Sequence, residues 1–408
     1  MSAFAIRDSR GLPGGFDSST GTISCIRLPM FFPSHIKCRR TGNWPRLSTM
    51  ELKSTLVNFS GKAQIDCVRF SANGLLAVSV SSLFNDVWGG SVKLFCRQSS
   101  GEFMETKHID LVGGNSSSLL FLKTLKLKEP EILVAASESG DVFFWNCDEE
   151  GLLVSPLGLV SGGHDKLVSC ITAVGTKSRG SFYSASYDRT IKLWNVSQTK
   201  APLQTFVGHS GPISSVSSCQ HNACSLVSGS FDRSILLWDK RQNRNVGKIL
   251  SKSMVHAVSW DCKYEHVFVS GHGDGSCCMY DTRNPCEPIF KHLSHNGAVC
   301  AVSCRPVESE EGGCVYAVGS DDHMVSLFSV SVALAEDPRV SAVPVYTFSA
   351  LSNPRIARTF GNHTDYVRSL AWSQEGRSLV TAGWDGRVNL FEYKNGWSGE
   401  KSTLSLRC

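Results

Sequence analysis

The residues in this sequence that are best suited to chemistry are histidines that recur at a nearly fixed distance from an aspartate. In each set the aspartate follows the histidine by 22 to 24 positions, and an aromatic residue follows the aspartate by six. An imidazole beside a carboxylate serves general acid and base catalysis in many enzymes, so these sets could be catalytic. They could also be structural, because buried polar groups must satisfy one another. The three sets are His164, Asp188 and Trp194; His209, Asp232 and Trp238; and His363, Asp385 and Phe391.

Other signatures of catalysis are missing from the sequence. It contains no H-E-x-x-H metal motif and no Walker-type phosphate loop, and the glycines at 271, 273 and 275 match a phosphate loop only in part. The 16 cysteines include no C-x-x-C pair, and most stand inside apolar runs. This pattern is typical of buried, reduced thiols in a cytosolic or nuclear protein. The sequence therefore predicts no enzyme activity, no metal and no cofactor.

The composition describes a folded body with an unevenly placed charge. The chain has 408 residues, of which 41% are apolar and 19% are charged, so it can bury a large core. The net charge of +5 comes entirely from residues 1–50, and the remainder is formally neutral. A neutral body argues against direct nucleic-acid binding. No apolar stretch is long enough for a membrane span, so we predict no membrane association.

Internal repeats organise most of the chain. Residues 190–194 (TIKLW) alternate in polarity as a half-buried strand does, and residues 228–233 (SGSFDR) read as a strand that ends in a turn. A repeat of about 45 residues is long enough for four short strands. The pattern resembles the WD-repeat family, and seven closing aromatic residues predict an all-β, seven-bladed propeller. They are Phe95, Trp145, Trp194, Trp238, Tyr280, Phe328 and Phe391.

Segments outside the repeats define the predicted domain boundaries. Residues 1–50 are rich in Gly, Ser, Pro and Arg, and we predict a disordered basic extension. The propeller is expected over residues 51–396, with residues 52–57 as the outer strand of the last blade. Residues 332–358 contain three prolines and are predicted to be an insertion between blades six and seven. Residues 397–408 are predicted to form a flexible tail.

The resemblance also gives the histidine sets a structural role. In WD-repeat proteins the histidine of an inter-blade loop bonds the turn aspartate, and a strand serine and the tryptophan continue the network. The sets are complete only in units three and four. Units one and two have Gly89 and Ser139 at the aspartate position, and units five to seven replace the tryptophan. We expect those other blades to depend more on apolar packing.

A more specific resemblance rests on four segments: residues 81–95 (SSLFNDVWGGSVKLF), 137–150, 164–169 and 363–388. They resemble the WD-repeat subunits of methylosomes, which are partners of the type II (symmetric) protein arginine methyltransferase. The resemblance implies a non-catalytic scaffold that binds this methyltransferase in a four-plus-four hetero-oligomer. It further implies help in presenting arginine-rich substrates, namely histones and the spliceosomal Sm proteins of snRNP assembly, in the cytoplasm and the nucleus.

The predicted partner-binding residues lie in the first unit. Residues 81–95 are expected to place a long loop where most WD-repeat chains have a tight turn, and Trp88 matches the family tryptophan that enters the methyltransferase's barrel domain. A tryptophan on such a loop offers a large, rigid contact. Leu83, Phe84 and Val87 extend this predicted apolar surface. Acidic residues could attract a basic substrate tail, or could simply be solvated; they are Glu138, Asp148, Glu149 and Glu150.

An alternative adaptor class remains open. The tetrapeptide Trp238-Asp239-Lys240-Arg241 matches the W-D-x-R box of substrate receptors of cullin ubiquitin ligases. A receptor of this kind would bind the ligase's propeller adaptor instead of a methyltransferase. The tetrapeptide is short and common in this fold, so it separates the two hypotheses only weakly.

Overall fold

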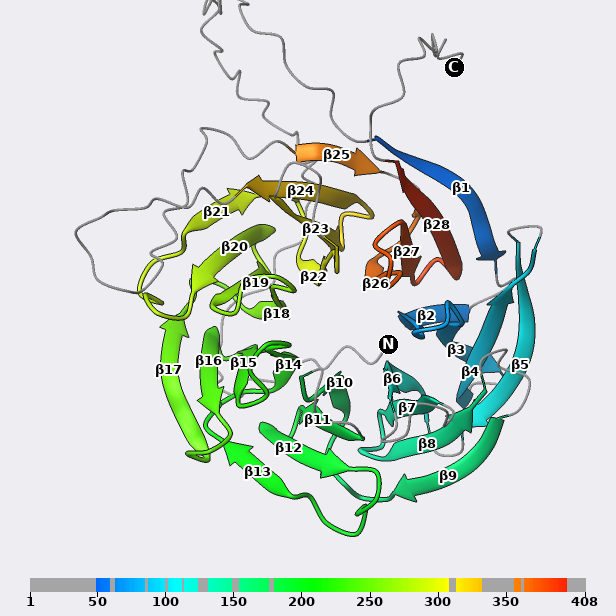
Figure 1. Cartoon of the computed structure of the whole chain (residues 1–408), viewed down its shortest axis with the longest axis horizontal. Helices are drawn as coiled ribbons and strands as arrows, with labels where there is room; N and C mark the ends of the chain where they lie inside the picture. Colours follow the sequence, from blue (N-terminus) through cyan, green and yellow to red (C-terminus); the bar gives the residue numbers. More distant parts are fainter. Residues whose placement is uncertain are drawn as a thin grey trace, which may run out of the picture. The chain divides into compact units, whose positions relative to one another are not determined.

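Seven four-stranded antiparallel sheets form the folded part of the chain (Figure 1). The computed structural model describes residues 49–58, 63–84, 87–99, 102–111, 114–123, 131–148, 154–175, 180–307, 313–331, 356–360 and 363–394. Each sheet is one blade of a ring, so the predicted seven-bladed propeller is confirmed. The described residues contain no helix that is long and apolar enough to cross a bilayer.

The first four blades follow the chain order from the centre outward. Blade one is β2 (Ala63–Phe70), β3 (Leu76–Phe84), β4 (Val87–Arg97) and β5 (Phe103–Leu111). Blade two is β6 (Ser116–Leu122), β7 (Glu131–Ser137), β8 (Val142–Cys147) and β9 (Val154–Val160). Blade three is β10 (Val168–Ala173), β11 (Ser181–Ser186), β12 (Thr190–Asn195) and β13 (Gln204–Val207). Blade four is β14 (Ile213–Ser218), β15 (Ser225–Ser230), β16 (Ser234–Asp239) and β17 (Arg244–Leu250).

The last three blades complete the ring. Blade five is β18 (Val255–Trp260), β19 (Val267–His272), β20 (Ser276–Asp281) and β21 (Phe290–Leu293). Blade six is β22 (Val299–Cys304), β23 (Gly313–Ser320), β24 (Val325–Ser331) and β25 (Ile356–Phe360). Blade seven is β26 (Val367–Trp372), β27 (Ser378–Gly383) and β28 (Arg387–Lys394), with β1 (Thr49–Asn58) on the outside.

The strand from the N-terminal side closes the ring. β1 pairs with β28 in antiparallel register from Thr49 opposite Lys394 to Asn58 opposite Arg387. This pairing covers the outer edge of blade seven, which would otherwise expose unpaired backbone groups. The strand contains the predicted residues 52–57, and it begins two residues inside the predicted extension 1–50.

The boundary of the predicted insertion needs a correction. β25 begins at Ile356, so the last three residues of the range 332–358 belong to the outer strand of blade six, and the insertion falls between β24 and β25 within blade six and not between blades six and seven. The alternation in residues 356–360 (IARTF) fits a strand. The insertion was predicted to end too late because the neighbouring Pro354 is typical of a loop. Residues 332–355, residues 1–48 and the predicted tail 397–408 lie outside the described residues.

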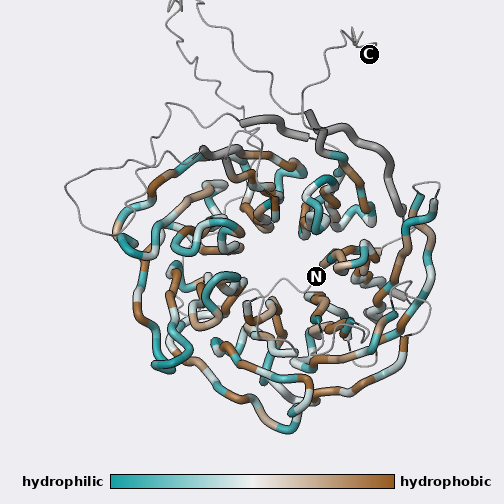
Figure 2. Tube along the Cα trace, viewed as in Figure 1, coloured by the Kyte–Doolittle hydropathy of each residue, from teal (hydrophilic) through white to brown (hydrophobic). Residues whose placement is uncertain are grey.

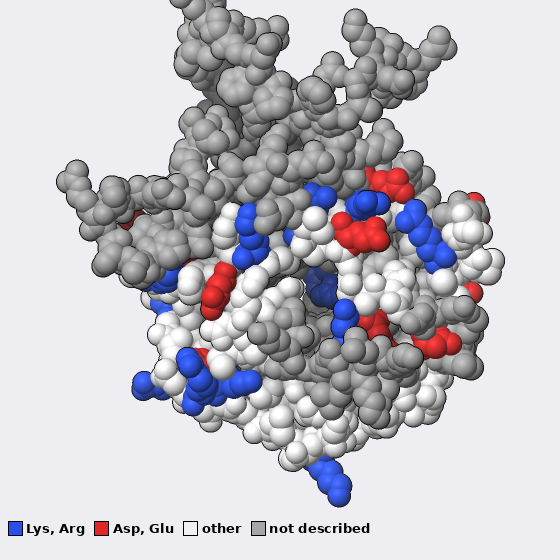
Figure 3. All heavy atoms as spheres, viewed as in Figure 1, with Lys and Arg blue, Asp and Glu red and all other residues white. Residues whose placement is uncertain are grey.

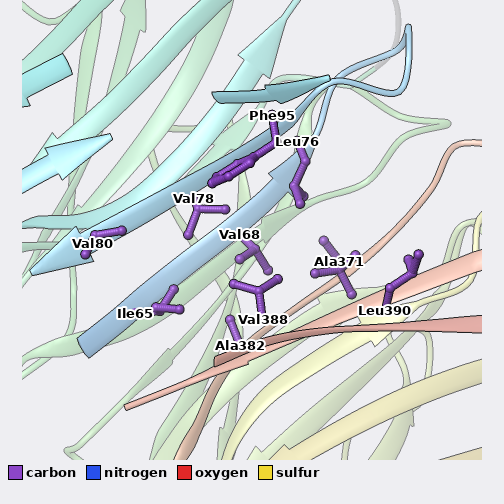
Figure 4. Close-up of a cluster of buried hydrophobic side chains, with 11 residues drawn as sticks. Ile65, Val68, Leu76, Val78, Val80, Phe95, Ala371, Ala382, Val388 and Leu390 are labelled. Carbon is purple, nitrogen blue, oxygen red and sulfur yellow. The ribbon is translucent and has the colours of Figure 1, made fainter. Parts of the chain in front are cut away.

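Apolar side chains fill the space between neighbouring blades. Brown and teal segments alternate along the strands because successive side chains face opposite sides of a sheet (Figure 2). At the seam between blades one and seven, Ile65, Val68 and Phe95 pack against Val388 and Leu390 (Figure 4). The same kind of cluster recurs between the other blades.

Candidate functional site

Two of the predicted histidine sets form complete hydrogen-bonded networks. In blade four, the Nε1 of Trp238 donates to the Oγ of Ser228 at 2.8 Å, and this hydroxyl lies 2.7 Å from the Nε2 of His209. The other ring nitrogen, Nδ1, lies 2.9 Å from the Oδ2 of Asp232. Blade three repeats the arrangement with Trp194, Ser184, His164 and Asp188. Each network connects the third strand of a blade to the loop that enters it.

In blade four, the fold keeps the aspartate of the network ionised and its histidine neutral. Burial alone would raise the pKa of Asp232, but hydrogen bonds from Ser234 and His209 outweigh it and hold this pKa well below its usual value. Burial lowers the pKa of His209, against the opposing effect of Asp232. A neutral imidazole that donates through Nδ1 and accepts through Nε2 satisfies all of these contacts.

This geometry suits a structural network better than a catalytic one. The side chains of His164 and His209 have no exposed surface, so a substrate cannot reach either imidazole. Both ring nitrogens of each histidine are already engaged. The stabilising role follows because each network satisfies several buried polar groups at once.

Blade seven keeps only part of its predicted set. His363 Nδ1 lies 3.1 Å from both carboxylate oxygens of Asp385, and its Nε2 lies 2.7 Å from the hydroxyl of Thr381. Phe391 is buried in the apolar seam and cannot donate a hydrogen bond. The amide of Asn389 lies 3.2 Å from the same Nε2, on the strand that carries Phe391. The repeat spacing predicted Phe391 as the member of the network, whereas Asn389, two positions earlier, makes the polar contact with His363.

Blade six contains a further histidine–aspartate pair, and its network has a gap where one hydrogen bond is missing. His295 Nδ1 lies 3.0 Å from the Oδ2 of Asp322. Its buried Nε2 has no hydrogen-bond partner among the described residues. Val318 occupies the strand position that Ser228 has in blade four. The gap therefore follows from one residue that lacks a hydroxyl.

The predicted partner-binding residues lie at the end of a long hairpin. The structure pairs Leu83 with Trp88 and Phe84 with Val87 across β3 and β4, beyond the pair of Ser82 and Gly89. The predicted long loop is therefore wrong, because the segment continues as two paired strands. Gly89 lies within β4 and not in a turn, which corrects its alignment with the turn aspartates. Figure 1 shows β3 and β4 between β2, the innermost strand of blade one, and β5, its outermost strand.

The W-D-x-R box adopts a local geometry that is repeated in the next blade. The guanidinium of Arg241 binds both carboxylate oxygens of Asp239, and its side chain is 71% exposed. Arg283 binds Asp281 in the same bidentate way at the end of β20. The pairing is thus a feature of the strand end in both blades, so it adds no weight to a ligase-receptor function.

Of the predicted acidic residues, Glu138 is exposed at the turn between β7 and β8 and accepts a hydrogen bond from the amide of Asn115 at 3.3 Å. Asp148 follows the end of β8 and is partly buried. Glu149 and Glu150 lie outside the described residues.

Sequence reasoning missed a polar cluster at one mouth of the central channel. The indole Nε1 of Trp384 donates to Asp66 Oδ1 at 2.9 Å, and the Oγ of Ser81 donates to the other carboxylate oxygen at 2.8 Å. The guanidinium of Arg368 lies 4.8 Å from the centre of the Trp384 indole. A signal was present, because Trp384 directly precedes the turn aspartate Asp385, but a single sequence does not show which side chains meet across blades.

A cysteine and an aspartate also meet at this mouth, and the state of the thiol argues against nucleophilic chemistry. The Sγ of Cys300 donates to the Oδ1 of Asp321 at 3.0 Å. Burial, together with this hydrogen bond, raises the pKa of Cys300 to about 12. The thiol is therefore protonated at neutral pH, and a thiolate is needed for nucleophilic attack. Among the described residues, no group of three or more His, Cys, Asp or Glu side chains is arranged to hold a metal ion.

Comparisons with known proteins agree with this architecture. The model of the WD domain, G-beta repeat, matches residues 156–195, 200–239 and 355–392. These segments cover the two complete histidine networks and blade seven. The chain is a seven-bladed β-propeller with WD repeats in these three segments, an architecture that supports a scaffold or adaptor role.

Among individual proteins, the chain is similar to methylosome protein WDR77 of Xenopus laevis. The two are 26% identical over 332 residues, which is 80% of this chain and 89% of the relative. More distant similarities include cell division cycle 20.4, a cofactor of the APC complex in Arabidopsis thaliana, at 26% identity over 51% of this chain and 43% of that protein. Ribosome biogenesis protein ytm1 of Botryotinia fuckeliana is 23% identical over 72% of this chain and 63% of its own length.

Proposed function

We propose that this chain is the adaptor of a type II protein arginine methyltransferase and that it helps to present arginine-rich substrates for symmetric dimethylation. The observation that carries the proposal is the elongated hairpin of β3 and β4, on a chain that resembles methylosome protein WDR77 over 80% of its length. The hairpin places Leu83, Phe84, Val87 and Trp88 in two adjacent cross-strand pairs at its end. Aromatic and aliphatic residues grouped in this way are typical of interface hot spots.

The proposed complex has four adaptor chains and four methyltransferase chains. Histones and spliceosomal Sm proteins are the proposed substrates, and the proposed locations are the cytoplasm and the nucleus. The sequence outside residues 1–50 is formally neutral, which supports a partner recognised by shape and apolar contact in preference to nucleic acid.

The experiment is an affinity purification of the tagged full chain, with mass spectrometry and light scattering of the eluted complex. We expect a type II methyltransferase in equal amount and a mass that fits four plus four chains. Trp88→Ala should reduce recovery of the methyltransferase at least about tenfold, as loss of a hot spot does. Leu250→Ala is the matched control, because Leu250 is a 76% exposed apolar residue on the outer strand of blade four.

Two results would refute the proposal. One is a folded Trp88→Ala variant that retains the methyltransferase as well as Leu250→Ala does. The other is recovery of a cullin ligase adaptor in place of a methyltransferase, which would favour the alternative reading of the box at 238–241.

A further inference from the structure

The innermost strands of the seven blades line the central channel. In four neighbouring blades, which form one arc of the ring, these strands contribute a different type of residue at one position than in the other three blades. A β-bulge falls at the same position of all seven strands. Blades two to four have a serine there, and its hydroxyl donates to a backbone carbonyl of the following blade. Blades five, six, seven and one instead have His256, Cys300, Arg368 and Asp66. The three serine hydroxyls form hydrogen bonds between neighbouring blades. The other four side chains supply the charged and titratable groups at this mouth of the channel.

Aromatic rings stand beside this arc on two sides. On one side Phe231 lies 5.7 Å from Tyr187 and 5.1 Å from the ring of His256. On the other side Trp384 lies 5.6 Å from Tyr366. The rings are partly exposed, although apolar faces of this size are usually covered. Arg368 already lies over the Trp384 ring, so this surface accommodates a guanidinium on one side, while Phe231 and Tyr187 meet edge to face and offer a second pair of partly exposed rings.

The charge of the mouth is predominantly negative. Asp66 and Arg368 line the channel, Asp321 accepts a hydrogen bond from Cys300 of the channel wall, and Glu138 lies near enough to Asp66 for that charge to raise its pKa. Partial burial, and then the nearby negative charge of Asp66, raise the pKa of Glu138. Burial lowers the pKa of His256, so this imidazole adds no charge at neutral pH. A second cation at this mouth would relieve the repulsion between carboxylates.

The channel limits how far such a cation can enter. It has a volume of about 550 Å³ and is also lined by Arg69, three residues further along β2 than Asp66. Figure 3 shows one end of the ring as a central hollow with basic side-chain atoms inside it. Arg69 donates to the backbone oxygens of Val68 and Leu370, so it is fixed in place. Its positive charge restricts a cationic guest to the mouth, where the carboxylates are.

We propose that the mouth formed by Phe231, Tyr187, Asp321, Glu138 and Asp66 binds an arginine side chain of an unstructured, arginine-rich peptide segment. A planar guanidinium can stack on the aromatic wall and donate to a carboxylate at the same time, which a lysine ammonium does less well. The inference rests on the proposed adaptor function, because it assigns the site for the presented substrate. The mouth lies on the same face as the β3–β4 hairpin, since Ser81 near the hairpin's base bonds Asp66.

The test measures peptide binding by the isolated full chain, without methyltransferase. Tryptophan fluorescence and calorimetry would follow titration with a Gly-Arg repeat peptide, and with Gly-Lys and Gly-Gln repeats of equal length. We expect the Gly-Arg peptide to bind at least about fivefold more tightly than Gly-Lys and the Gly-Gln peptide not to bind. Higher salt should weaken the binding, because the contacts are partly exposed.

Variants decide whether this mouth is the site. The double variant Asp321→Asn with Glu138→Gln should weaken Gly-Arg binding at least about tenfold. Its matched control is Asp110→Asn with Glu375→Gln, which removes two carboxylates that are 87% and 76% exposed elsewhere on the ring. Phe231→Ala should also weaken binding, and its thermal midpoint would verify folding. If Phe231→Ala does not fold, the charge variants still decide the question.

Equal binding of Gly-Arg by the mouth variant and its control would overturn the proposal, and so would equal binding of Gly-Gln. Either result would leave methyltransferase docking at the hairpin untouched, because that contact is measured separately with Trp88→Ala. Conversely, peptide binding that persists in Trp88→Ala would support the mouth as a separate site.

Discussion

Removing one hydroxyl from blade four tests whether the histidine networks stabilise the ring. Ser228 is fully buried, and its Oγ accepts from Trp238 Nε1 and donates to His209 Nε2. Ser228→Ala leaves the indole N–H and the imidazole nitrogen without this partner. A buried polar group that loses its partner costs about 1–3 kcal/mol, so two of them should lower the free energy of unfolding by about 3 kcal/mol. An alanine fits sterically, because blade two has Ala135 at the equivalent position.

The assay is equilibrium urea unfolding followed by circular dichroism, with a double-mutant cycle to Trp238→Phe. In the Trp238→Phe background no indole N–H is left to lose its partner, so Ser228→Ala should cost only about half as much. The expected coupling free energy between the two residues is therefore about 1.5 kcal/mol. A loss below about 1 kcal/mol for Ser228→Ala, or additive effects in the cycle, would refute the claim that this hydroxyl stabilises the blade through both partners.

Three further perturbations test other contacts within the ring. Val318→Thr should raise the free energy of unfolding by about 1 kcal/mol in urea, because its hydroxyl can satisfy the buried Nε2 of His295; an unchanged midpoint would contradict this. Burial lowers the pKa of His272 from 6.5 to about 4, so the neutral form is favoured in the fold, and stability is complete above pH 6.5 and falls as the pH drops toward 4. Melting curves over this range should lose roughly 3 kcal/mol from this residue, and His272→Gln, unlike the exposed control His108→Gln, should flatten the profile. Deletion of residues 49–58 removes β1 and uncovers the edge of β28, so light scattering should detect association or a marked fall in melting temperature, and a monomer of unchanged stability would argue against closure by this strand.

The repeat spacing carries most of the information about the fold. A four-stranded blade is a local structure, in which alternation of apolar residues and a fixed histidine-to-aspartate distance are set within about 45 residues. For this reason the sequence predicted seven blades, the closing strand at 52–57 and the histidine–aspartate pairs of blades three, four and seven. It misplaced Gly89 in a turn, because a hairpin that continues for two more pairs beyond Gly89 has the same residue alternation as a loop with scattered apolar residues. It likewise selected Phe391 for the network in blade seven, although Asn389 makes the polar contact.

The sequence by itself determined the units of this protein, because each unit's strands and turn network are specified by residues close together in the chain. Only the tertiary structure decided what the units make together at the channel mouth. Asp66 and Trp384 are 318 residues apart in sequence, yet the closure of the ring brings them to 2.9 Å. No local pattern encodes that distance, because it depends on the number of blades and on the pairing of β1 with β28 that fixes the last blade beside the first.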